Sequence, residues 1–441
     1  MLLLTQYDAL HTLYSHTSGA VWQWPDSGLN LTQGKPWNFT SECVSDGVSD
    51  EVSGGGRDGG GECVSEGVRE DPCADDWSGV VCNLTHAECA HSPCHITTLL
   101  LNNFNMSGYL PEIFALLSTL HTLSLSGNML THSLPHSVGN LTALHVLSLS
   151  DNLFTGRIPD TYSNLLQLRI LDLKGNSLTH SIPHSIQTAQ YSHLQVFYIG
   201  ENNLSGPIPS LTHSLDLRRI YLTENSLTGP IPSSYYSFTR LQYLGLATNK
   251  ITGTLSSDIG YLKQLTNFYC GYNSLHSSIP SEVGELSLLE YFLVTKNSLS
   301  GTIPSEMGSL LNLLVLELNI NSLTGTIPSE LGDLTVMHSL YLHDNSLSGT
   351  IPHSFTKLAS LQLFILAQNE LTGTIPEGMS GLTSLYDFSV YNNRLSGEVC
   401  GEIFLLPRLE KFLLQNNALT GFRMSEETLT KVAHMNISVS Y

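Results

Sequence analysis

The sequence predicts an α/β repeat solenoid, a right-handed superhelix with a parallel sheet on its concave face. Three observations predict this fold. A unit of about 24 residues recurs along most of the 441-residue chain, nearly every copy carries an asparagine at the same place, and leucines alternate with variable residues just before it. A unit of this length cannot bury its leucines alone, so neighbouring units must stack into one elongated body. Repetition therefore outweighs the two or three globular domains that length alone would suggest.

The repeat is clearest in NSLTGTIPSELGDL, residues 321–334, whose first eight residues nearly recur at 297–304, 345–352 and 369–376. Spacing between the units is 24 residues, except for 26 before Asn202 and 23 after it. An earlier unit has Phe104 in place of the asparagine, which gives about fourteen repeats between residues 96 and 421. The aligned asparagines are Asn128, Asn152, Asn176, Asn202, Asn225, Asn249, Asn273, Asn297, Asn321, Asn345, Asn369, Asn393 and Asn417.

The first part of each unit predicts a short strand that ends in a turn. In LYLHDN (340–345), Leu340 and Leu342 point to one side and Tyr341 and His343 to the other, because strand side chains alternate faces. The leucine side becomes core and the other side stays free. A turn leaves backbone amides and carbonyls unpaired, and the amide group of a buried asparagine can satisfy both. We therefore expect the stacked asparagines to form a ladder.

The second part of each unit predicts a return path along the outer side. Leu347 fills the core, Gly349 permits a close backbone approach, and residues 351–352 (Ile-Pro) form a short extended segment. The LGDL segment at 331–334 then brings the chain back. The complete pattern, LxxLxLxxNxLxGxIP, resembles the plant-type leucine-rich repeat.

The chain before the repeats resembles the N-terminal cap of the same family. The similarity lies in DALHTLYSHTSGAVW (8–22) and DPCADDWSGVVC (71–82). It implies a helix that covers the first repeat, a disulfide between Cys73 and Cys82, and Trp77 as the plug of the solenoid end. Such caps occur on plant receptor ectodomains, polygalacturonase inhibitors and many algal and protist repeat proteins.

Three regions follow from this comparison. Residues 1–95 form the cap, with a flexible acidic, glycine-rich insertion at 41–71; residues 96–421 form the repeats; and residues 422–441 form a short C-terminal cap or tail without a cysteine pair. The chain contains no protein-kinase signature, so the receptor-kinase version of the family is not expected here.

The cysteines and glycosylation motifs predict an oxidising, extracellular or cell-surface location. Six of the eight cysteines lie in the first hundred residues, and besides the cap pair we expect Cys43 with Cys63 and Cys89 with Cys94. An alternative is a zinc cluster of Cys82, His86, Cys89, His91, Cys94 and His95, but the spacing lacks paired CxxC ligands. N-x-S/T motifs occur at Asn30, Asn38, Asn83, Asn105, Asn140, Asn203 and Asn436.

Charge and hydropathy restrict the partners. With 38 acidic and 18 basic residues the net charge is −20, which disfavours nucleic acid and anionic membranes and favours a cationic or neutral partner. No run of about 18 apolar residues predicts a membrane span. The start, MLLLTQYDAL, lacks the basic and long apolar regions of a secretory signal.

The variable strand positions supply the candidate binding residues. Aromatic side chains concentrate in the middle of the expected concave face, and tyrosine combines a large contact area with a polar group. The alternative is a cross-strand ladder that only stabilises the sheet. The candidate ligand-binding residues are Tyr198, Arg219, Tyr221, Tyr243, Tyr269, Tyr272, Tyr291, Glu317 and Tyr341.

These observations favour an extracellular module that recognises a protein, peptide or glycan, in the manner of a receptor or an inhibitor. An enzyme is not expected, since no catalytic motif is present and most of the 18 histidines are separated by whole repeats. Neither a cofactor nor a metal is expected. The alternative is a structural or ice-binding solenoid, because Thr302, Thr326, Thr350 and Thr374 form an aligned outer row.

Overall fold

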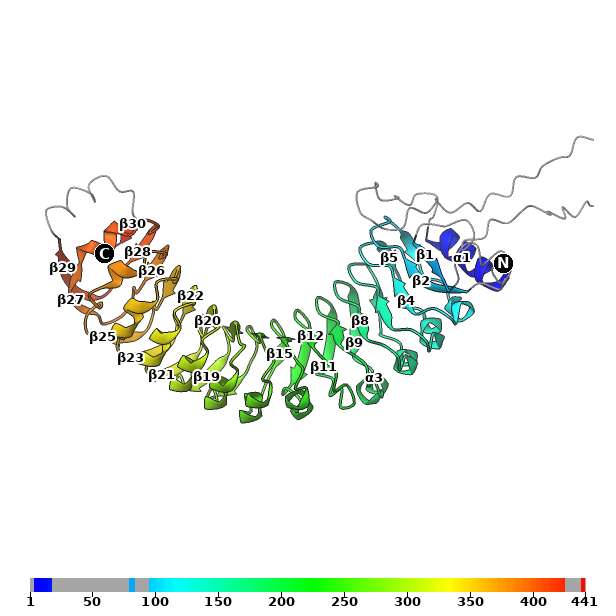
Figure 1. The fold of residues 1–441 in the computed structure, drawn as a ribbon, viewed down its shortest axis with the longest axis horizontal. Coiled ribbons are helices and arrows are strands. Elements are labelled where there is room, and N and C mark those ends of the chain that lie inside the picture. Colours follow the sequence, from blue (N-terminus) through cyan, green and yellow to red (C-terminus); the bar gives the residue numbers. More distant parts are fainter. Residues whose placement is uncertain (1–3, 18–78, 84–94, 425–437, 441) are drawn as a thin grey trace, which may run out of the picture.

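The computed structural model describes residues 4–17, 79–83, 95–424 and 438–440. These residues form a curved solenoid in which one turn follows another along an arc (Figure 1). A sixteen-stranded sheet lines the inner side of the arc, and helical turns lie on the outer side. The predicted α/β repeat solenoid with a concave parallel sheet is therefore confirmed.

The long sheet takes one strand from each repeat, with β1 before the repeats and β30 after them. Its strands, in spatial order, are β1 (Val80–Cys82), β2 (Ile96–Leu100), β4 (Thr122–Ser124), β6 (Val146–Ser148), β8 (Ile170–Asp172), β10 (Val196–Tyr198), β12 (Arg219–Tyr221), β14 (Tyr243–Gly245), β16 (Asn267–Tyr269), β18 (Tyr291–Leu293), β20 (Val315–Glu317), β22 (Ser339–Tyr341), β24 (Leu363–Ile365), β26 (Asp387–Ser389), β28 (Lys411–Leu413) and β30 (Ser438–Ser440).

Second strands, one in each of most units, lie after the ladder position and pair within smaller sheets. They are β3 (Ser107–Tyr109) with β5 (Met129–Thr131); β7 (Thr155–Gly156), β9 (Ser177–Ser181), β11 (Asn203–Pro207), β13 (Ser226–Gly229) and β15 (Lys250–Ile251); β17 (His276–Ser277), β19 (Ser298–Gly301), β21 (Ser322–Thr326), β23 (Ser346–Thr350) and β25 (Glu370–Thr372); and β27 (Ser396–Cys400) with β29 (Ala418–Arg423).

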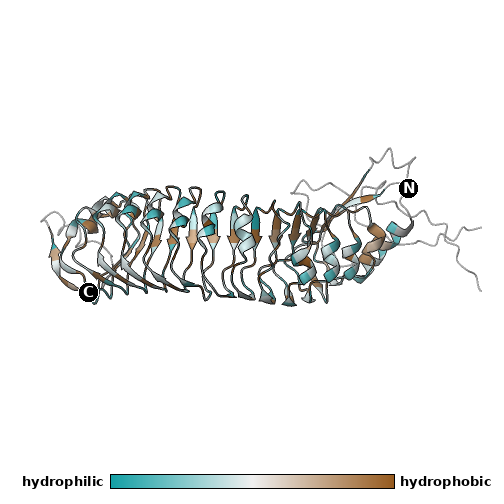
Figure 2. Cartoon of the chain, turned by 90° about the horizontal axis from the view of Figure 1, so that it is seen from below, coloured by the Kyte–Doolittle hydropathy of each residue, from teal (hydrophilic) through white to brown (hydrophobic). Residues whose placement is uncertain are grey.

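The helical turns form a row on the convex side, visible from below in Figure 2. All but α1 follow the extended segment of a repeat, and in most of them a proline of that segment precedes the first helical residue. They are α1 (Leu4–His16), η2 (Phe114–Leu117), η3 (His136–Asn140), η4 (Asp160–Asn164), α3 (His184–Thr188), η5 (Ser233–Ser237), η6 (Ser257–Tyr261), η7 (Ser281–Glu285), η8 (Ser305–Ser309), η9 (Ser329–Asp333), η10 (His353–Lys357), η11 (Met379–Gly381) and η12 (Gly401–Leu405).

The length of a unit decides its outer turn. The 26-residue unit before Asn202 has an α-helical turn, α3, where most of the 24-residue units have a 3-10 turn. The 23-residue unit that follows has no helical turn between β11 and β12. Added or missing residues are therefore absorbed on the convex side, and the inner strands keep their register.

The inner strands pair in parallel, and each residue faces its equivalent in the next unit, as Phe268 faces Phe292. The exception is β1, which runs antiparallel to β2. Sequence analysis did not predict this reversal, which allows residues 83–95 to connect the two strands. Across it, the backbone amide of His95 donates a hydrogen bond to Asn83 Oδ1 at 2.9 Å.

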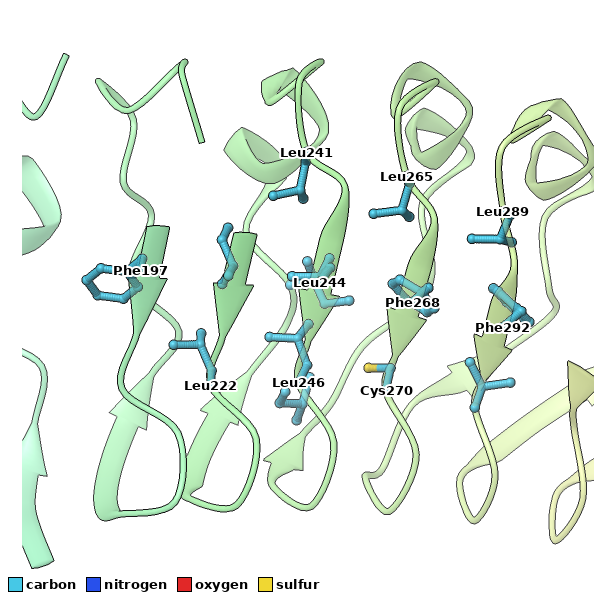
Figure 3. Packing of buried hydrophobic residues seen from close by; sticks show 14 of the residues in the cluster. Phe197, Leu222, Leu241, Leu244, Leu246, Leu265, Phe268, Cys270, Leu289 and Phe292 are labelled. Carbon is cyan, nitrogen blue, oxygen red and sulfur yellow. The ribbon is translucent and has the colours of Figure 1, made fainter. Parts of the chain in front are cut away.

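The core consists of rows of equivalent side chains, shown for the middle repeats in Figure 3. Phe268 and Phe292 stack at a centroid distance of 5.3 Å. Cys270 replaces a leucine in its row, is fully buried and is free of any disulfide. Each unit therefore relies on both neighbours to exclude water from its apolar residues.

The predicted asparagine ladder is present. Asn152 Nδ2 donates hydrogen bonds to the carbonyl oxygens of Leu125 and Leu149 at 3.0 and 3.2 Å. The amide of Leu130 donates to Asn152 Oδ1 at 3.0 Å. The same contacts recur through to Asn417, so that one side chain serves the backbone of two consecutive units.

The glycine of LxGxIP requires a correction. Gly349 has a φ of 75°, and a Cβ atom there would lie 2.8 Å from Thr326 Cγ2. The close neighbour is thus a side chain rather than backbone, and the left-handed conformation is the main requirement. His132 and His180 occupy the same slot with φ of 66° and 67°. A threonine hydroxyl contacts each imidazole Nδ1 at 2.9 Å.

Each end of the solenoid carries an element outside the repeats. The cap helix α1 begins at Leu4, earlier than the 8–22 segment suggested, and its Ala9, Leu10 and Leu13 are buried. At the other end, β30 pairs in parallel with β28, so the sheet continues beyond residue 421. Trp77 and the acidic insertion at 41–71 lie outside the described residues, and the division into three regions stays a prediction.

Candidate functional site

The candidate site is the inner face, by which we mean the solvent side of the sixteen-stranded sheet. Most strands contribute two side chains to this face, one on either side of a buried residue, as Tyr291 and Leu293 do around Phe292. The alternation follows from strand geometry. Side chains 24 residues apart in most units are neighbours on this face, as Tyr291 and Val315 are.

Five tyrosines form a continuous aromatic row across five strands, β10 to β18. We call Tyr198, Tyr221, Tyr243, Tyr269 and Tyr291 the tyrosine row. Successive ring centroids are 5.8, 6.1, 5.2 and 6.1 Å apart, and most of the pairs meet edge to face. All five side chains are partly exposed. The prediction that these tyrosines gather on one surface is therefore confirmed, whereas their role in binding stays a prediction.

Glycine makes room for this row. Tyr243 and Tyr269 lie on different sides of their strands' central residues, so the row zigzags across the sheet. A Cβ atom on Gly245 would lie 2.9 Å from Tyr243 Cε1 and 3.2 Å from Tyr221 Cδ2. The missing side chain at Gly245 therefore lets the two neighbouring rings approach each other over β14.

Charged residues hold Tyr221, the second tyrosine of the row. The Tyr221 hydroxyl donates a hydrogen bond to Glu201 Oε1 at 2.8 Å, and Lys174 Nζ lies 3.2 Å from the same oxygen. The ammonium group also lies 5.6 Å from the centroid of the Tyr221 ring. Burial, and then the Glu201 carboxylate, raise the pKa of Tyr221 well above its usual range. This tyrosine is therefore a neutral hydrogen-bond donor at every physiological pH.

Two of the predicted residues lie beside the row rather than in it. Arg219 is exposed on β12, and Tyr341 on β22 is separated from the row by β20. Tyr272 is different, because it lies in the turn after β16 with a φ of 56° and half of its surface exposed. The Lys296 ammonium lies 5.1 Å from its ring centroid. Tyr272 thus belongs to the rim of the inner face.

The rim consists of the turn residues that follow the inner strands, and the repeat pattern did not predict their backbone conformation. The residue directly before the ladder asparagine has a positive φ in unit after unit, whatever its type: Gly127, Asp151, Gly175, Glu201, Glu224, Thr248, Tyr272, Lys296, Ile320, Asp344, Gln368, Asn392 and Asn416. β-branched residues rarely adopt this conformation. Ile320 does so with 40% of its surface exposed.

Sequence analysis also missed an apolar area on the inner face beyond the row. Leu293, Val315, Leu363 and Ile365 are partly exposed there, on β18, β20 and β24. They occupy the same places within their repeats as the tyrosines, so the repeat alignment could have revealed them. Together with the tyrosine row, they extend the contact surface over eight consecutive strands of the sheet.

Chemically, this surface offers aromatic and aliphatic contacts with scattered hydrogen-bonding groups. Among the described side chains, no group of three or more His, Cys, Asp or Glu is placed to hold a metal ion. His86, Cys89, His91 and Cys94 of the alternative zinc cluster lie outside that part of the chain. Of the helices that the structure describes, none is long and apolar enough to cross a membrane.

The predicted modifications are tested only in part. Cys82 takes part in a disulfide. Cys43, Cys63, Cys73, Cys89 and Cys94 lie outside the described residues, so the proposed pairings stay predictions. Among the predicted glycosylation sites, Asn83, Asn140 and Asn203 are exposed and Asn105 is partly exposed. Asn30, Asn38 and Asn436 are not among the described residues.

A second surface, on the side of the arc that carries the Thr-Ile-Pro segments, matches the expected threonine row. Thr302, Thr326, Thr350 and Thr374 are all exposed. An open groove of about 790 Å³ passes over the first three of them, and Pro304 and Pro328 contribute to its floor. The groove is shallow and periodic, without a side chain that singles out one repeat.

Comparison with known proteins supports a leucine-rich repeat architecture. The family models described as Leucine rich repeat match residues 335–395 and residues 119–141, 143–165 and 167–189. No curated protein sequence matches the chain.

Three solved structures are similar to most of the chain. A TDR receptor shares 29% identity with a TM-score of 0.67, over 73% of this chain and 60% of that one. The plant peptide hormone receptor RGFR1 in complex with RGF2 shares 30% with a TM-score of 0.61, over 73% and 59%. The PEPR1–AtPEP1 complex shares 31% with a TM-score of 0.57, over 79% and 55%. The chain thus spans between 55% and 60% of the length of these structures.

Proposed function

Because this chain is a leucine-rich repeat protein with the ectodomain fold of plant peptide-hormone receptors, we propose that it is an extracellular recognition module that binds its ligand along the inner face. The observation that carries the proposal is the tyrosine row. Five partly exposed rings in mutual contact give a large apolar surface edged by hydroxyl groups. Tyrosine is enriched at binding hot spots for this combination.

A purely stabilising role explains the row less well. The buried phenylalanines already stack from unit to unit below the sheet, as Phe364 and Phe388 do at 5.3 Å. Outward tyrosines add little to that core, yet they leave apolar ring surface in contact with water. A ligand that covers the rings would remove this surface from water and gain hydrophobic free energy.

The shape of the surface favours an extended ligand. Strands in a sheet are about 4.8 Å apart, so the eight strands from β10 to β24 span on the order of 35 Å. That length suits an extended peptide, a segment of a protein or a glycan, and it suits a small molecule poorly. Two of the similar structures are described as a complex with RGF2 and a complex with AtPEP1.

The proposal includes the rest of the architecture. Residues 1–95 cap the solenoid, disulfides of the cap place the protein in an oxidising compartment, and exposed N-x-S/T motifs carry glycans. The inner face binds without catalysis, and the ligand is a protein, peptide or glycan rather than nucleic acid. A net charge of −20 agrees with a neutral or cationic ligand.

The test is affinity capture from the extracellular fraction of the source organism. Wild-type protein is compared with a variant in which Tyr198, Tyr221, Tyr243 and Tyr269 are all changed to Ala. Tyr261, which is exposed on η6 of the convex side, provides the matched control as Tyr261→Ala. We expect the quadruple variant to lose the captured partner while its circular dichroism and thermal unfolding stay close to wild type. Equal capture by all three proteins would refute binding along this face.

One alternative rests on a separate observation, the exposed threonine row with its flat groove. A periodic row of threonines is suited to an ice surface. Changing Thr302, Thr326 and Thr350 to leucine should abolish thermal hysteresis if the solenoid binds ice, and should leave ligand capture unchanged. Wild-type protein without thermal hysteresis excludes this function.

A further inference from the structure

Among the described residues, the carboxylate of Glu317 on the inner face has neither a hydrogen bond nor an ion pair. Glu317 lies at the end of β20, between Leu293 on β18 and Tyr341 on β22. Val315 precedes it on the same side of the strand. The carboxylate therefore stands among apolar side chains, directly beyond the tyrosine row.

The other inner-face carboxylates of the described strands are all engaged. Asp172 accepts hydrogen bonds from Ser148 Oγ at 3.0 Å and from the Lys174 amide at 3.2 Å. Asp387 accepts one from Ser389 Oγ at 2.5 Å and pairs with Lys411 at 3.5 Å. Within the described residues, neither a hydrogen bond nor an ion pair engages Glu317, and its half-burial raises the pKa of its carboxyl group.

A second polar group next to Glu317 is also unsatisfied. Asn319, two residues further along the chain, is 8% exposed, and its Oδ1 has no hydrogen-bond donor among the described residues. Its Nδ2 lies 3.2 Å from His343 Nε2, and Nδ1 of the same imidazole is likewise without a partner. In either orientation of the Asn319 amide, an acceptor in this pair lacks a donor.

We propose that Glu317 is the centre of a subsite for the side chain of an arginine or lysine residue in an extended peptide ligand, a proposal that rests on inner-face binding. The cationic head would donate to the Glu317 carboxylate, and its aliphatic stem would cover Leu293 and Val315. The partly exposed Tyr341 ring on the neighbouring strand would offer a cation–π contact. The unpaired acceptor of the Asn319 and His343 pair has no exposed surface, so the Glu317 carboxylate alone would accept from the ligand.

The surroundings distinguish a side-chain cation from a metal ion. Calcium requires six to eight oxygen ligands, whereas only one carboxylate and one amide oxygen are present here. A guanidinium or ammonium group on an apolar stem instead matches a single carboxylate among aliphatic and aromatic side chains. The strongly acidic chain would also attract a basic peptide from a distance.

The experiment is selection from a display library of random twelve-residue peptides on three proteins. These are wild type, Glu317→Gln, and Asp172→Asn as a control for loss of a carboxylate that is already paired. We expect wild type and Asp172→Asn to enrich peptides with arginine or lysine at one fixed position, and Glu317→Gln to lose this preference. Selected peptides should bind Glu317→Gln at least about tenfold more weakly, as expected for a charge-assisted hydrogen bond.

Additional measurements distinguish failure of the Glu317 subsite from failure of the proposed function. Replacing the selected arginine by citrulline should weaken binding to wild type about as much as Glu317→Gln does, and the two changes together should add little. Peptides that need the tyrosine row but bind Glu317→Gln equally well would overturn the subsite and leave the proposed function standing. Selection of no peptide by wild type would overturn the peptide subsite, whereas the proposed function is tested separately by the affinity capture described above. Binding of spermine that requires Glu317, without peptide enrichment, would assign the carboxylate to a free polyamine and overturn the peptide assignment.

Discussion

Replacing the buried ladder residue Asn152 by alanine is the most direct test of how the solenoid is held together. The Asn152 side chain is 5% exposed and makes four hydrogen bonds with backbone groups. The two N–H groups of Nδ2 are shared among the carbonyl oxygens of Leu125, Leu149 and Ser150, and Oδ1 accepts from the Leu130 amide. After the change to alanine, the three carbonyl oxygens keep other donors, which are Asn128 Nδ2, Asn176 Nδ2 and the Gly127 amide. The Leu130 amide loses its acceptor in a space that water enters poorly.

The expected loss of stability follows from this count. An unsatisfied buried polar group costs about 1 to 3 kcal/mol. The one amide that loses its acceptor predicts a loss of about 1 to 3 kcal/mol for Asn152→Ala. Because each repeat is stabilised only by its neighbours, we also expect the unfolding transition to broaden as the two sides of the break lose their coupling.

Equilibrium urea unfolding, followed by circular dichroism, measures this loss. The control is Asn312→Ala, since Asn312 is exposed and its side chain donates a single hydrogen bond, to the Ser287 carbonyl at 2.8 Å. The control should lose less than about 1 kcal/mol. A change below about 1 kcal/mol for Asn152→Ala as well would refute the view that the ladder carries the backbone of each turn.

Three further predictions concern single positions. Ile320→Asn should stabilise the fold by about 1 kcal/mol in urea unfolding, because asparagine tolerates the left-handed conformation that isoleucine adopts there at a φ of 56°. Gly325→Ala should destabilise the fold by about 1 to 3 kcal/mol, since φ is 76° and the new Cβ would lie 2.8 Å from Thr302 Cγ2. Adding Thr302→Ser removes that methyl group, so it should recover the loss caused by the contact but not the loss caused by the backbone conformation. Glu317→Gln should raise the melting temperature at pH 7 but not below pH 4.5. The reason is that burial raises the pKa of the carboxyl group in the folded state, so ionisation of Glu317 opposes folding above that pKa. Below the ordinary pKa of 4.5 the carboxyl group is protonated in both states and its ionisation has no effect on stability. An equal gain for Glu317→Gln at both pH values would contradict this assignment.

The sequence was sufficient for the features that recur as one residue type at one place. Asn345 and its equivalents predicted the ladder, because an asparagine side chain both donates and accepts. Leu340 and Leu342 predicted the direction of the strand. The tyrosine row was also predictable, since strand alternation and the spacing of the units place Tyr243 beside Tyr221 and Tyr269.

Other features could not be predicted from residue type. The left-handed residue before the ladder asparagine can be Glu224, Thr248 or Ile320, so residue type carries no signal of its conformation. For this reason Tyr272 was expected on the strand face and lies on the rim. The antiparallel β1 depends on a reversal outside the repeats. The isolation of Glu317 required knowledge of every neighbour, because a carboxylate is unpaired only if none of the surrounding residues is a donor.

The separation between the buried and the free positions has a consequence for specificity. The inner-face side chains of the middle strands stand on backbone that is hydrogen-bonded to both neighbouring strands. A substitution of an outward residue such as Tyr269 leaves the buried residue of the same strand, Phe268, unchanged. Substitutions three strands apart, such as those of Tyr198 and Tyr269, should therefore have additive effects on binding. Adjacent rings in contact, such as Tyr243 and Tyr269 at 5.2 Å, should be coupled. A surface built in this way can acquire a new ligand one position at a time, while the ladder and the core that hold the solenoid together remain unchanged.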